Sequence, residues 1–491
     1  MKIKHYLAID LGATSGRSIL ATFDGQSVSM REVARFANPM IPMREHICWD
    51  LPALLNNILD SMKSIAKEGI ELTSIGIDTW GCDFAIFGRD GQLLGLPYCY
   101  RDSHTRGSME RLFERMPAAE VYERTGIQFM EFNSLFQLDT LRHNGSSALS
   151  IADKILFIPD ALGYMLTGEA VTEKTVASTS QILNAHTGLL DEDLLSLIGL
   201  THEQFGKQVE PATVIGTLTP EIQRHTGLGA VPVVAVAGHD TASAVVAIPS
   251  ESNDFAYLSC GTWSLLGIES PKPIINEESF KQNFTNEGGI DNTIRFLKNI
   301  CGLWIFERCR SEWSDAPSSV AELVESALTT SFDSLINPDA PCFANPESMT
   351  RAITDYCVKT GQQAPQTYAE YCRLIFRSLA LRYRQVLSLL DGFASNPIAH
   401  LNVIGGGSQN KILMQFTANA IGRKVIAGPA ECTALGNVLI QMRASGDCNT
   451  SGEIRKIASQ STATAVYTPT EAEIWEAAYA QFIAIQQLEN N

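Results

Sequence analysis

The chain has 491 residues, too many for a single hydrophobic core, so about two to four domains are expected. Its hydrophobic content of 45% and charged content of 19% are ordinary for a soluble globular protein and give no sign of disorder. The net charge of −17 argues against nucleic acid as a partner, because counterion release needs a basic surface and the sequence has no Lys/Arg cluster. An anionic ligand must therefore be held by local donors and a divalent cation.

The cysteines and the apolar runs indicate the compartment. Eleven cysteines form no C-x-x-C pair and no zinc-type spacing, which favours free thiols in a reducing environment. The N-terminus has no signal-peptide pattern, and no apolar run reaches the ~18 residues that a membrane span needs. We expect a cytoplasmic protein that needs no disulfide and has no membrane partner.

Residues 6–24 predict two strands joined by a tight glycine turn. The first apolar run ends at Asp10, and Thr14 and Ser15 occupy the tip of the turn. Hydroxyls, backbone N–H groups and one carboxylate therefore converge where a phosphate could approach. Glycine-rich hairpins are common, so this one alone would be weak evidence for phosphate binding.

The next elements follow in chain order. We expect a strand at 27–36, a helix that Trp49 and Asp50 open, a buried strand at 74–87 that returns as a hairpin, helices within 107–125 and 134–142, further helical segments to about 228, and a strand, turn and helix over 232–248. Gly81 interrupts the strand at 74–87, which indicates close approach by a ligand or a bulge packed by a neighbouring element. Asp50 is interpreted as a helix start, although with Trp49 it could line a ligand site.

The apolar periodicity stops over 249–254, so we place the domain boundary there, giving domains 1–248 and 249–491. The second half repeats the first, with a strand, Gly-Thr turn and strand at 255–269 and a glycine turn at 402–410. A long amphipathic helix is expected at 366–392, with its Arg and Tyr residues on a solvated face. A last, outer helix is expected at 470–488.

We expect each half to contain a phosphate-binding hairpin, and we expect the glycine turn to bind a nucleoside. Together these features predict a protein that binds ATP between two domains. The sequence has no Walker A motif, because Gly12 and Gly16 are one residue too close and Arg17 stands in place of Lys. It also has no dinucleotide fingerprint and no protein-kinase signature. Nicotinamide chemistry and Walker-type ATPases are thus disfavoured.

Five motifs together resemble the FGGY family of carbohydrate kinases. They are Asp10–Arg17, Gly76–Gly81, Gly238–Ser243, Cys260–Ser264 and Ile404–Asn410. The resemblance runs from about residue 6 to 440 and implies the duplicated α/β fold of actin, hexokinase and Hsp70 (ribonuclease H-like), with the active site in the cleft between two domains. Further motifs are similar to the branch acting on L-rhamnulose: Tyr100–Ser103, Gly126–Phe129, Asn133–Gln137, Thr285–Gly289 and Leu297–Ile300.

Two residues depart from the pattern of the family. Many members carry Lys where Gln137 stands, which favours the L-rhamnulose branch. Glu307 stands where a nucleotide-contacting Gln is expected, which puts that contact in doubt.

The resemblance implies a role for each site residue. Asp240 is the expected general base for the primary hydroxyl of the sugar. The expected ATP-binding residues are Ala13, Thr14, Ser15, Gly16, Arg17, Thr262, Glu307 and Gly406. The expected sugar-binding residues are Gly81, His239, Asp240, Thr241 and Asn299, and Asp10 is expected to orient Mg²⁺ through water. The residues themselves leave alternatives open: Asp78 could be the base, Asp240 could cap a helix, and His239 could be structural.

The implied activity is ATP-dependent phosphorylation of L-rhamnulose at its 1-hydroxyl, in L-rhamnose catabolism, by a monomer or homodimer. L-Fuculose and D-xylulose are alternative acceptors. An actin- or Hsp70-like ATPase would share the nucleotide clamp, but the sequence offers no separate peptide-binding domain.

Overall fold

A computed structural model describes residues 3–250, 252, 254–314 and 316–489 of the chain. The chain forms two compact units. Unit 1 comprises Met1–Glu251, Glu269–Phe296 and Cys432–Ser461, and unit 2 comprises Ser252–Ile268, Leu297–Glu431 and Thr462–Asn491. These units interleave in sequence, whereas the expected domains 1–248 and 249–491 are continuous, and that boundary stays a prediction.

Unit 1 is built on a six-stranded sheet in the order β11-β12-β6-β1-β2-β3. The first two strands, β1 (Lys4–Leu11) and β2 (Ser15–Phe23), form the predicted antiparallel hairpin. β1 runs parallel to β6 (Ser74–Thr79), and β6 runs parallel to β12 (Pro232–Ala235). The other strands of unit 1 are β3 (Val28–Ala37), β4 (Met40–Met43), β5 (His46–Trp49), β7 (Phe84–Phe87), β8 (Lys154–Phe157), β9 (Val171–Glu173), β10 (Lys207–Val209), β11 (Thr213–Thr217) and β15 (Thr285–Gly288).

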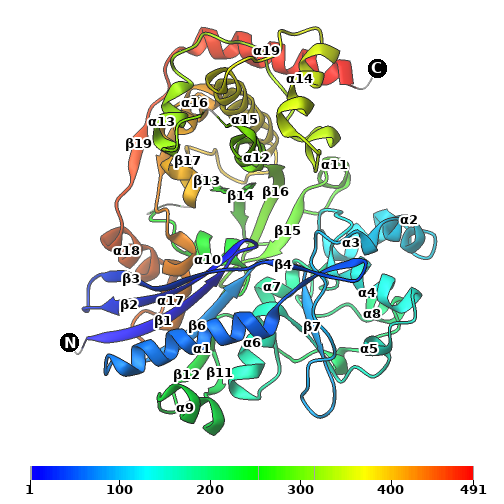
Figure 1. Ribbon diagram of the computed structural model, residues 1–491, viewed down its shortest axis with the longest axis vertical. Helices are drawn as coiled ribbons and strands as arrows, with labels where there is room; N and C mark the ends of the chain where they lie inside the picture. Colours follow the sequence, from blue (N-terminus) through cyan, green and yellow to red (C-terminus); the bar gives the residue numbers. More distant parts are fainter. Residues whose placement is uncertain (1–2, 251, 253, 315, 490–491) are drawn as a thin grey trace. The chain divides into compact units, whose positions relative to one another are not determined.

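Helices cover both faces of this sheet (Figure 1). The helices of unit 1 are α1 (Leu51–Lys67), α2 (Ser108–Phe113), α3 (Ala118–Thr125), α4 (Ser134–His143), α5 (Ser147–Ser150), α6 (Ile158–Thr167), α7 (Lys174–Ser178), α8 (Glu192–Leu197), α9 (Pro220–Thr226), α10 (Asp240–Val246), α11 (Glu277–Lys281), α17 (Cys432–Ala444) and α18 (Ser451–Ser461). Of these, α1, α6, α10, α17 and α18 contact strands of the sheet. The α1 helix begins as predicted, because the Asp50 carboxylate accepts a hydrogen bond from the backbone N–H of Ala53 at 3.0 Å.

Side-chain alternation along β1 decides which helix each residue meets. Leu7, Ile9 and Leu11 belong to the hydrophobic core that α1 and α6 complete. The residues between them face α17, as shown by Tyr6, whose hydroxyl contacts Ser445 and Asp447 just beyond that helix. Asp10 lies on this second face, away from the main core.

The break predicted at Gly81 in the strand at 74–87 is confirmed, but the two parts join different sheets. The segment divides into β6, which joins the main sheet, and β7, which pairs with β8 in a separate ribbon. Gly81 lies between the two, and a Cβ added there would come within 2.7 Å of Thr179 Oγ1. Close packing by a neighbouring segment therefore accounts for this glycine.

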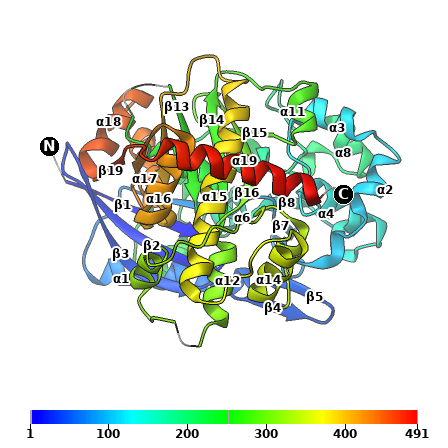
Figure 2. The ribbon, with the colours of Figure 1, turned by 90° about the horizontal axis from the view of Figure 1, so that it is seen from above.

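Unit 2 contains most of a seven-stranded sheet in the order β15-β16-β14-β13-β17-β18-β19. Its elements are β13 (Phe255–Cys260), β14 (Trp263–Ser270), β16 (Ile294–Cys301), α12 (Trp304–Glu312), α13 (Val320–Ser326), α14 (Met349–Lys359), α15 (Tyr368–Asp391), β17 (His400–Ile404), α16 (Lys411–Ile421), β18 (Lys424–Ala427), β19 (Ala465–Tyr467) and α19 (Ala472–Glu489). The predicted second hairpin forms from β13 and β14. Figure 2 shows α19 crossing α15, which it also contacts.

The expectation of a solvated Arg/Tyr face on α15 is wrong for several residues. Tyr383 is fully buried, and Tyr371 and Arg377 are buried as well. The aromatic and aliphatic parts of these long side chains contribute to packing, which the amphipathic pattern alone does not reveal.

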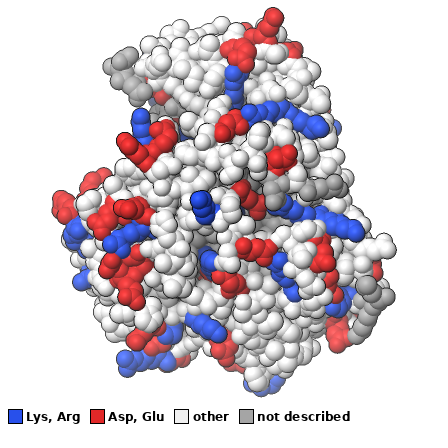
Figure 3. Space-filling view, turned by 180° about the vertical axis from the view of Figure 1, so that it is seen from behind, with Lys and Arg blue, Asp and Glu red and all other residues white. Residues whose placement is uncertain are grey.

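Charged residues of both signs are interspersed on the visible face in Figure 3. Across the described residues, no helix is both long enough and apolar enough to span a bilayer. All eleven cysteines are free thiols, and ten of them are buried or partly buried.

Candidate active site

The carboxyl ends of neighbouring parallel strands bring acidic residues to one edge of the unit 1 sheet. Asp10 on β1 is the register partner of Asp78 on β6. The N–H of Thr79 donates to the Gly238 carbonyl at 2.9 Å, which places the turn before Asp240 beside the same strand end. Ligands of open α/β sheets bind at this edge.

Asp78 is fully buried, and its two oxygens have different surroundings. Its Oδ2 accepts a hydrogen bond from Asn437 Nδ2 of α17 at 2.6 Å, whereas Oδ1 has no partner within the described chain. Burial, followed by the charge of Asp10 and more weakly that of Asp240, raises the pKa of Asp78 well above its ordinary value. The charges of Asp10 and Asp240 therefore both act on Asp78.

Asp10 forms an ion pair with Arg17 across the first hairpin, with 2.5 Å between Asp10 Oδ2 and Arg17 Nη2. The described residues contain no group of three acidic, His or Cys side chains that could hold a metal alone. Mg²⁺ in kinases is commonly held by one or two carboxylates, with water and substrate phosphates completing its shell. A buried carboxylate oxygen without a donor, beside a second carboxylate, fits such an ion.

Asp240 is the first residue of α10, so the interpretation that it caps this helix is wrong. His239 occupies the N-cap position and makes no side-chain capping bond. The Asp240 side chain remains 34% exposed, and its Oδ1 accepts a hydrogen bond from Thr241 Oγ1 at 3.0 Å. The carboxylate is thus fixed by its neighbours and still reachable.

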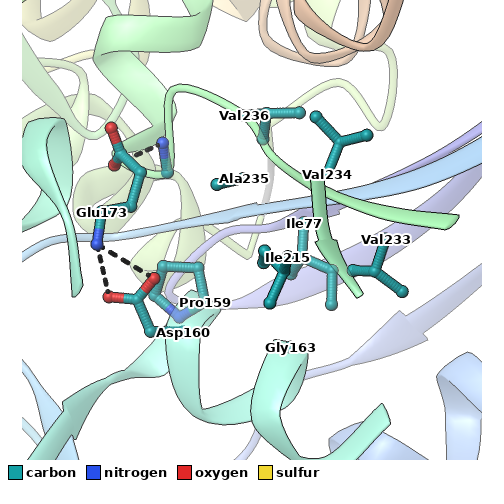
Figure 4. Close-up of a pocket in the computed structure, with 11 residues that line it drawn as sticks. Ile77, Pro159, Asp160, Gly163, Glu173, Ile215, Val233, Val234, Ala235 and Val236 are labelled. Carbon is teal, nitrogen blue, oxygen red and sulfur yellow. Dashed lines mark hydrogen bonds between the residues drawn. The ribbon is translucent and has the colours of Figure 1, made fainter. Parts of the chain in front are cut away.

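A second acidic pair, Glu173 and Asp160, is joined by hydrogen bonds from the Glu173 N–H to the Asp160 carboxylate (Figure 4), and Glu173 also contacts the turn before Asp240. The Glu173 carboxylate accepts hydrogen bonds from the Gly238 N–H at 3.0 Å and from Thr175 Oγ1 at 2.7 Å. Thr175 Oγ1 in turn accepts from the His239 N–H at 3.3 Å. Gly238 is required here, because an added Cβ would come within 2.9 Å of Glu173 Oε2.

The two acids border a cavity of about 10 Å³, roughly the space of one water molecule. Burial and the neighbouring Glu173 raise the pKa of Asp160 well above its ordinary value. Asp160 accepts the Glu173 N–H at 3.1 Å.

His239 is buried between two further charged residues, Glu287 and Arg295. Arg295 Nη2 lies 3.1 Å from His239 Nδ1, and Glu287 Oε2 lies 3.3 Å from the same nitrogen. His239 Nε2 lies 3.4 Å from Asp240 Oδ1. The histidine therefore lies between the expected base and a buried ion pair.

A tryptophan-lined carboxylate lies beside Gly81. Asp83 accepts hydrogen bonds from Trp49 Nε1 at 2.6 Å, Trp80 Nε1 at 2.9 Å and Gln137 Nε2 at 2.8 Å. Burial raises the pKa of Asp83 to about 6 despite these donors. Gln137 stands where many family members are expected to carry Lys, and in this chain it donates a hydrogen bond to the Asp83 carboxylate.

The expected phosphate residues of the first hairpin have unequal exposure. Thr14 is exposed, and Ala13, Ser15 and Arg17 are partly buried. Ser15 belongs to β2, and its carbonyl accepts the Gly12 N–H at 2.9 Å, closing the turn. Gly16 is buried, and an added Cβ would come within 2.3 Å of Phe36, so close packing requires glycine at this position.

In unit 2, the second hairpin and the glycine turn lie against each other. Cβ atoms added to Gly405 and Gly407 would come within 3.0 Å of the Cys260 carbonyl and 2.3 Å of Cys260 Sγ. Gly406 is exposed with open space over its Cα. Of these three glycines, only Gly406 is free to face a ligand.

The other expected site residues of unit 2 are Thr262, Asn299 and Glu307, and they differ in exposure. Thr262 is exposed at the tip of the second hairpin, and its carbonyl accepts the N–H groups of Gly302 and Trp304, both at 3.2 Å. Asn299 is partly buried on β16. Glu307 is exposed on α12 and forms an ion pair with Arg310 at 2.5 Å.

The sequence does not point to several residues that contact the candidate site residues and hold them in place. Glu287 lies inside a motif already singled out, so its acidic side chain next to two glycines was a usable signal. Asn437, Glu173 and Arg295 carried no local signal, because helix and strand patterns do not reveal a polar side chain that reaches another segment. Tyr383 was missed for the same reason: its hydroxyl lies 2.7 Å from Ser264 Oγ of the second hairpin.

The site and the duplicated hairpins define a phosphotransferase-type α/β protein, and comparison with known proteins identifies the family. Residues 5–247 match the N-terminal domain, and residues 256–445 the C-terminal domain, of the FGGY family of carbohydrate kinases. The chain belongs to this family.

Its curated relatives are similar over the whole length. Rhamnulokinase of Bacteroides thetaiotaomicron is 54% identical over 480 residues, covering 98% of this chain and 99% of the relative. Rhamnulokinase of Pectobacterium atrosepticum is 42% identical, covering 100% and 98%, and that of Bacillus subtilis is 39% identical, covering 95% and 96%.

Solved structures confirm the predicted two-domain α/β fold. A ligand-bound xylulose kinase from Lactobacillus acidophilus superimposes with a TM-score of 0.82 at 18% identity, covering 99% of this chain and 98% of the other. Plasmodium falciparum glycerol kinase with ADP gives 0.78 at 16% identity, covering 98% of each chain. At these identities the likeness concerns the fold alone.

Proposed function

We propose that this carbohydrate kinase transfers the γ-phosphoryl group of ATP to the 1-hydroxyl of L-rhamnulose, giving L-rhamnulose 1-phosphate and ADP in L-rhamnose catabolism. Full-length relatives that are rhamnulokinases support the acceptor. The single structural observation that carries the chemistry is the placement of Asp240: a reachable carboxylate at the sheet edge where Asp10 and Asp78 end neighbouring strands.

Asp240 acts as the general base in this proposal. A primary alcohol is too weak an acid to lose its proton before attack, so a carboxylate must accept the proton as the oxygen closes on phosphorus. Asp240 is held by Thr241 and by the turn that Glu173 supports. Asp78 is a poorer candidate, because it is fully buried and bound by Asn437.

Positioning and charge neutralisation supply most of the remaining catalysis of phosphoryl transfer. Ala13 to Arg17, Thr262 and Gly406 would bind ATP, and Gly81, His239, Thr241 and Asn299 would bind the sugar. Glu307 is a weaker ATP contact, because Arg310 already engages it. Asp10 would hold Mg²⁺ through water, with Asp78 close by, and the ion would neutralise phosphate charge when bound.

An ATPase that acts without a sugar is the alternative from another class. ADP release, followed with ATP alone and with ATP plus L-rhamnulose, separates the two. We expect release only with the sugar, and ³¹P NMR should place the product phosphate on C1. Equal ADP release without sugar would contradict the proposal.

A cytoplasmic location and a monomeric or homodimeric state remain predictions from the sequence. Size-exclusion chromatography with light scattering measures the second directly against the chain mass of 53.6 kDa.

A further inference from the structure

The buried pair Arg295 and Glu287 reaches the ring of His239, and no part of the reaction described above uses it. We propose that Arg295 and Glu287 fix His239 as the neutral tautomer with its proton on Nε2, so that His239 donates to Asp240 Oδ1 and leaves Oδ2 for the proton of the sugar hydroxyl. This inference rests on the proposed function, in which Asp240 is the base. Both residues are then positioning residues, because they act through His239.

The donor inventory of arginine decides the tautomer. A guanidinium has only N–H donors, so the nitrogen that it approaches must offer a lone pair. Arg295 Nη2 lies 3.1 Å from His239 Nδ1 in hydrogen-bond geometry. Nδ1 is therefore unprotonated, and the single ring proton of a neutral imidazole lies on Nε2.

The guanidinium has little freedom to turn away. Arg295 is fully buried, and its Nε donates to the Gly288 carbonyl at 2.9 Å, which fixes the plane of the group. Glu287 Oε2 lies 3.1 Å from Arg295 Nη2 and balances the buried positive charge.

Glu287 also lies 3.3 Å from His239 Nδ1, so the opposite tautomer must be weighed. A proton on Nδ1 would point toward Glu287, but it would also face the N–H groups of Arg295, and two donors would then oppose each other. Burial acts to raise the pKa of Glu287, but Arg295 and His239 outweigh it and lower that pKa. Glu287 is therefore charged and forms an ion pair with Arg295, in which Oε2 lies 3.1 Å from Nη2 without a hydrogen bond. The tautomer with Nε2–H is therefore favoured.

The Nε2–H tautomer directs the His239 proton toward Oδ1 of Asp240. Thr241 Oγ1 donates a hydrogen bond to Oδ1 at 3.0 Å. His239 Nε2 lies 3.4 Å from the same oxygen, which is long for a hydrogen bond; catalytic hydrogen bonds often shorten only when substrate binds. Thr241 therefore donates to Oδ1, and the proposed Nε2–H of His239 lies close to the same oxygen. The structure gives Oδ2 no protein donor among the described residues, so this oxygen remains to accept the substrate proton.

Long-range ¹H–¹⁵N correlation spectra of histidine-labelled protein test the tautomer without substrate. His239→Gln assigns the signal among the nine histidines. In the wild type, we expect Nδ1 to resonate as an unprotonated nitrogen and Nε2 as a protonated one. A protonated Nδ1 would overturn the proposal.

Two variants test the pair. Arg295→Lys keeps the positive charge but loses the planar donor geometry of the guanidinium. If this variant does not fold, Glu287→Gln serves as the second test, because it removes the negative charge that balances Arg295. Arg295→Lys should shift the tautomer signal, whereas Glu287→Gln should leave Nδ1 unprotonated. Either variant should lower kcat by about 10²-fold, with the KM for ATP unchanged, because the base is misplaced but the nucleotide site is untouched. Arg31→Lys, in a surface pair with Glu68, is the matched control and should change neither readout.

A folded Arg295→Lys protein with the wild-type tautomer and wild-type kcat would overturn the proposal. If the wild-type protein shows the predicted tautomer but phosphorylates no sugar, the proposed function is wrong. The tautomer assignment would then remain valid, but its catalytic role would not.

Discussion

Asp10 on β1 and Asp78 on β6 are direct register partners in two parallel strands, so two carboxylates lie side by side at one sheet edge. Asp78 is fully buried there, and burial together with the charge of Asp10 raises its pKa. Such an arrangement costs stability unless a cation shares the site. We therefore expect a cation and phosphates to bind at this edge.

The first prediction separates the two candidate bases. Asp240→Asn keeps the shape of the side chain but cannot accept a proton, so kcat should fall by about 10²- to 10⁴-fold. ATP binding, measured by calorimetry, should be retained. Wild-type turnover in Asp240→Asn, combined with loss of activity in Asp78→Asn, would transfer the role of base to Asp78.

The second prediction concerns the pH dependence of stability. Asp160 is buried with a raised pKa, so the folded state disfavours its charged form. The free energy of unfolding should therefore fall as the pH rises from the ordinary Asp value of 3.8 through the raised value, because the unfolded chain ionises first.

Asp160→Asn removes this loss and keeps an acceptor for the Glu173 N–H. The variant should be more stable than the wild type at pH 8, and its advantage should shrink toward pH 5, as measured by urea unfolding. An advantage that does not depend on pH would contradict the assignment.

The third prediction compares two adjacent glycines. Gly407→Ala would place a Cβ 2.3 Å from Cys260 Sγ, so the glycine turn must shift against the second hairpin, at a cost of about 1–3 kcal/mol. Gly406→Ala meets open space and should leave the melting temperature almost unchanged.

If Gly406 faces the nucleoside, Gly406→Ala should raise the KM for ATP and leave that for the sugar unchanged. Unchanged kinetics for both substrates would remove Gly406 from the nucleotide site.

The fourth prediction concerns the support of the second hairpin. Tyr383→Phe removes the hydroxyl that lies 2.7 Å from Ser264 Oγ, so both stability and hairpin position should suffer. We expect a loss of about 1–2 kcal/mol in unfolding free energy and a higher KM for ATP. A double-mutant cycle with Ser264→Ala should show coupling, and strict additivity would contradict a direct bond.

Local patterns in the sequence predicted much of the fold. Both hairpins, the helix that Asp50 caps, and the strand, turn and helix that carry Asp240 follow from apolar periodicity and turn residues. At 74–87 the break was predicted but not the separation into two sheets, because periodicity cannot tell one broken strand from two strands that join different sheets. The interleaving of the two units was equally invisible, since residues 432–461 return to unit 1 without any compositional signal.

The sequence indicates a candidate site residue where that residue stands in a glycine-rich motif. Asp10, Asp240 and Gly406 belong to such motifs. The residues that hold them do not: Glu173 supports the Asp240 turn across 65 positions, and Asn437 reaches Asp78 across 359. Tertiary contacts over such distances leave no trace in spacing or composition.

The most direct test of the account is a comparison of acceptors under one set of conditions. Purified protein is assayed for kcat/KM with ATP and, in turn, L-rhamnulose, L-fuculose and D-xylulose, with ADP release as the readout. We predict that L-rhamnulose gives the highest value and that Asp240→Asn abolishes most of it. A higher kcat/KM for L-fuculose or D-xylulose would contradict the proposed substrate.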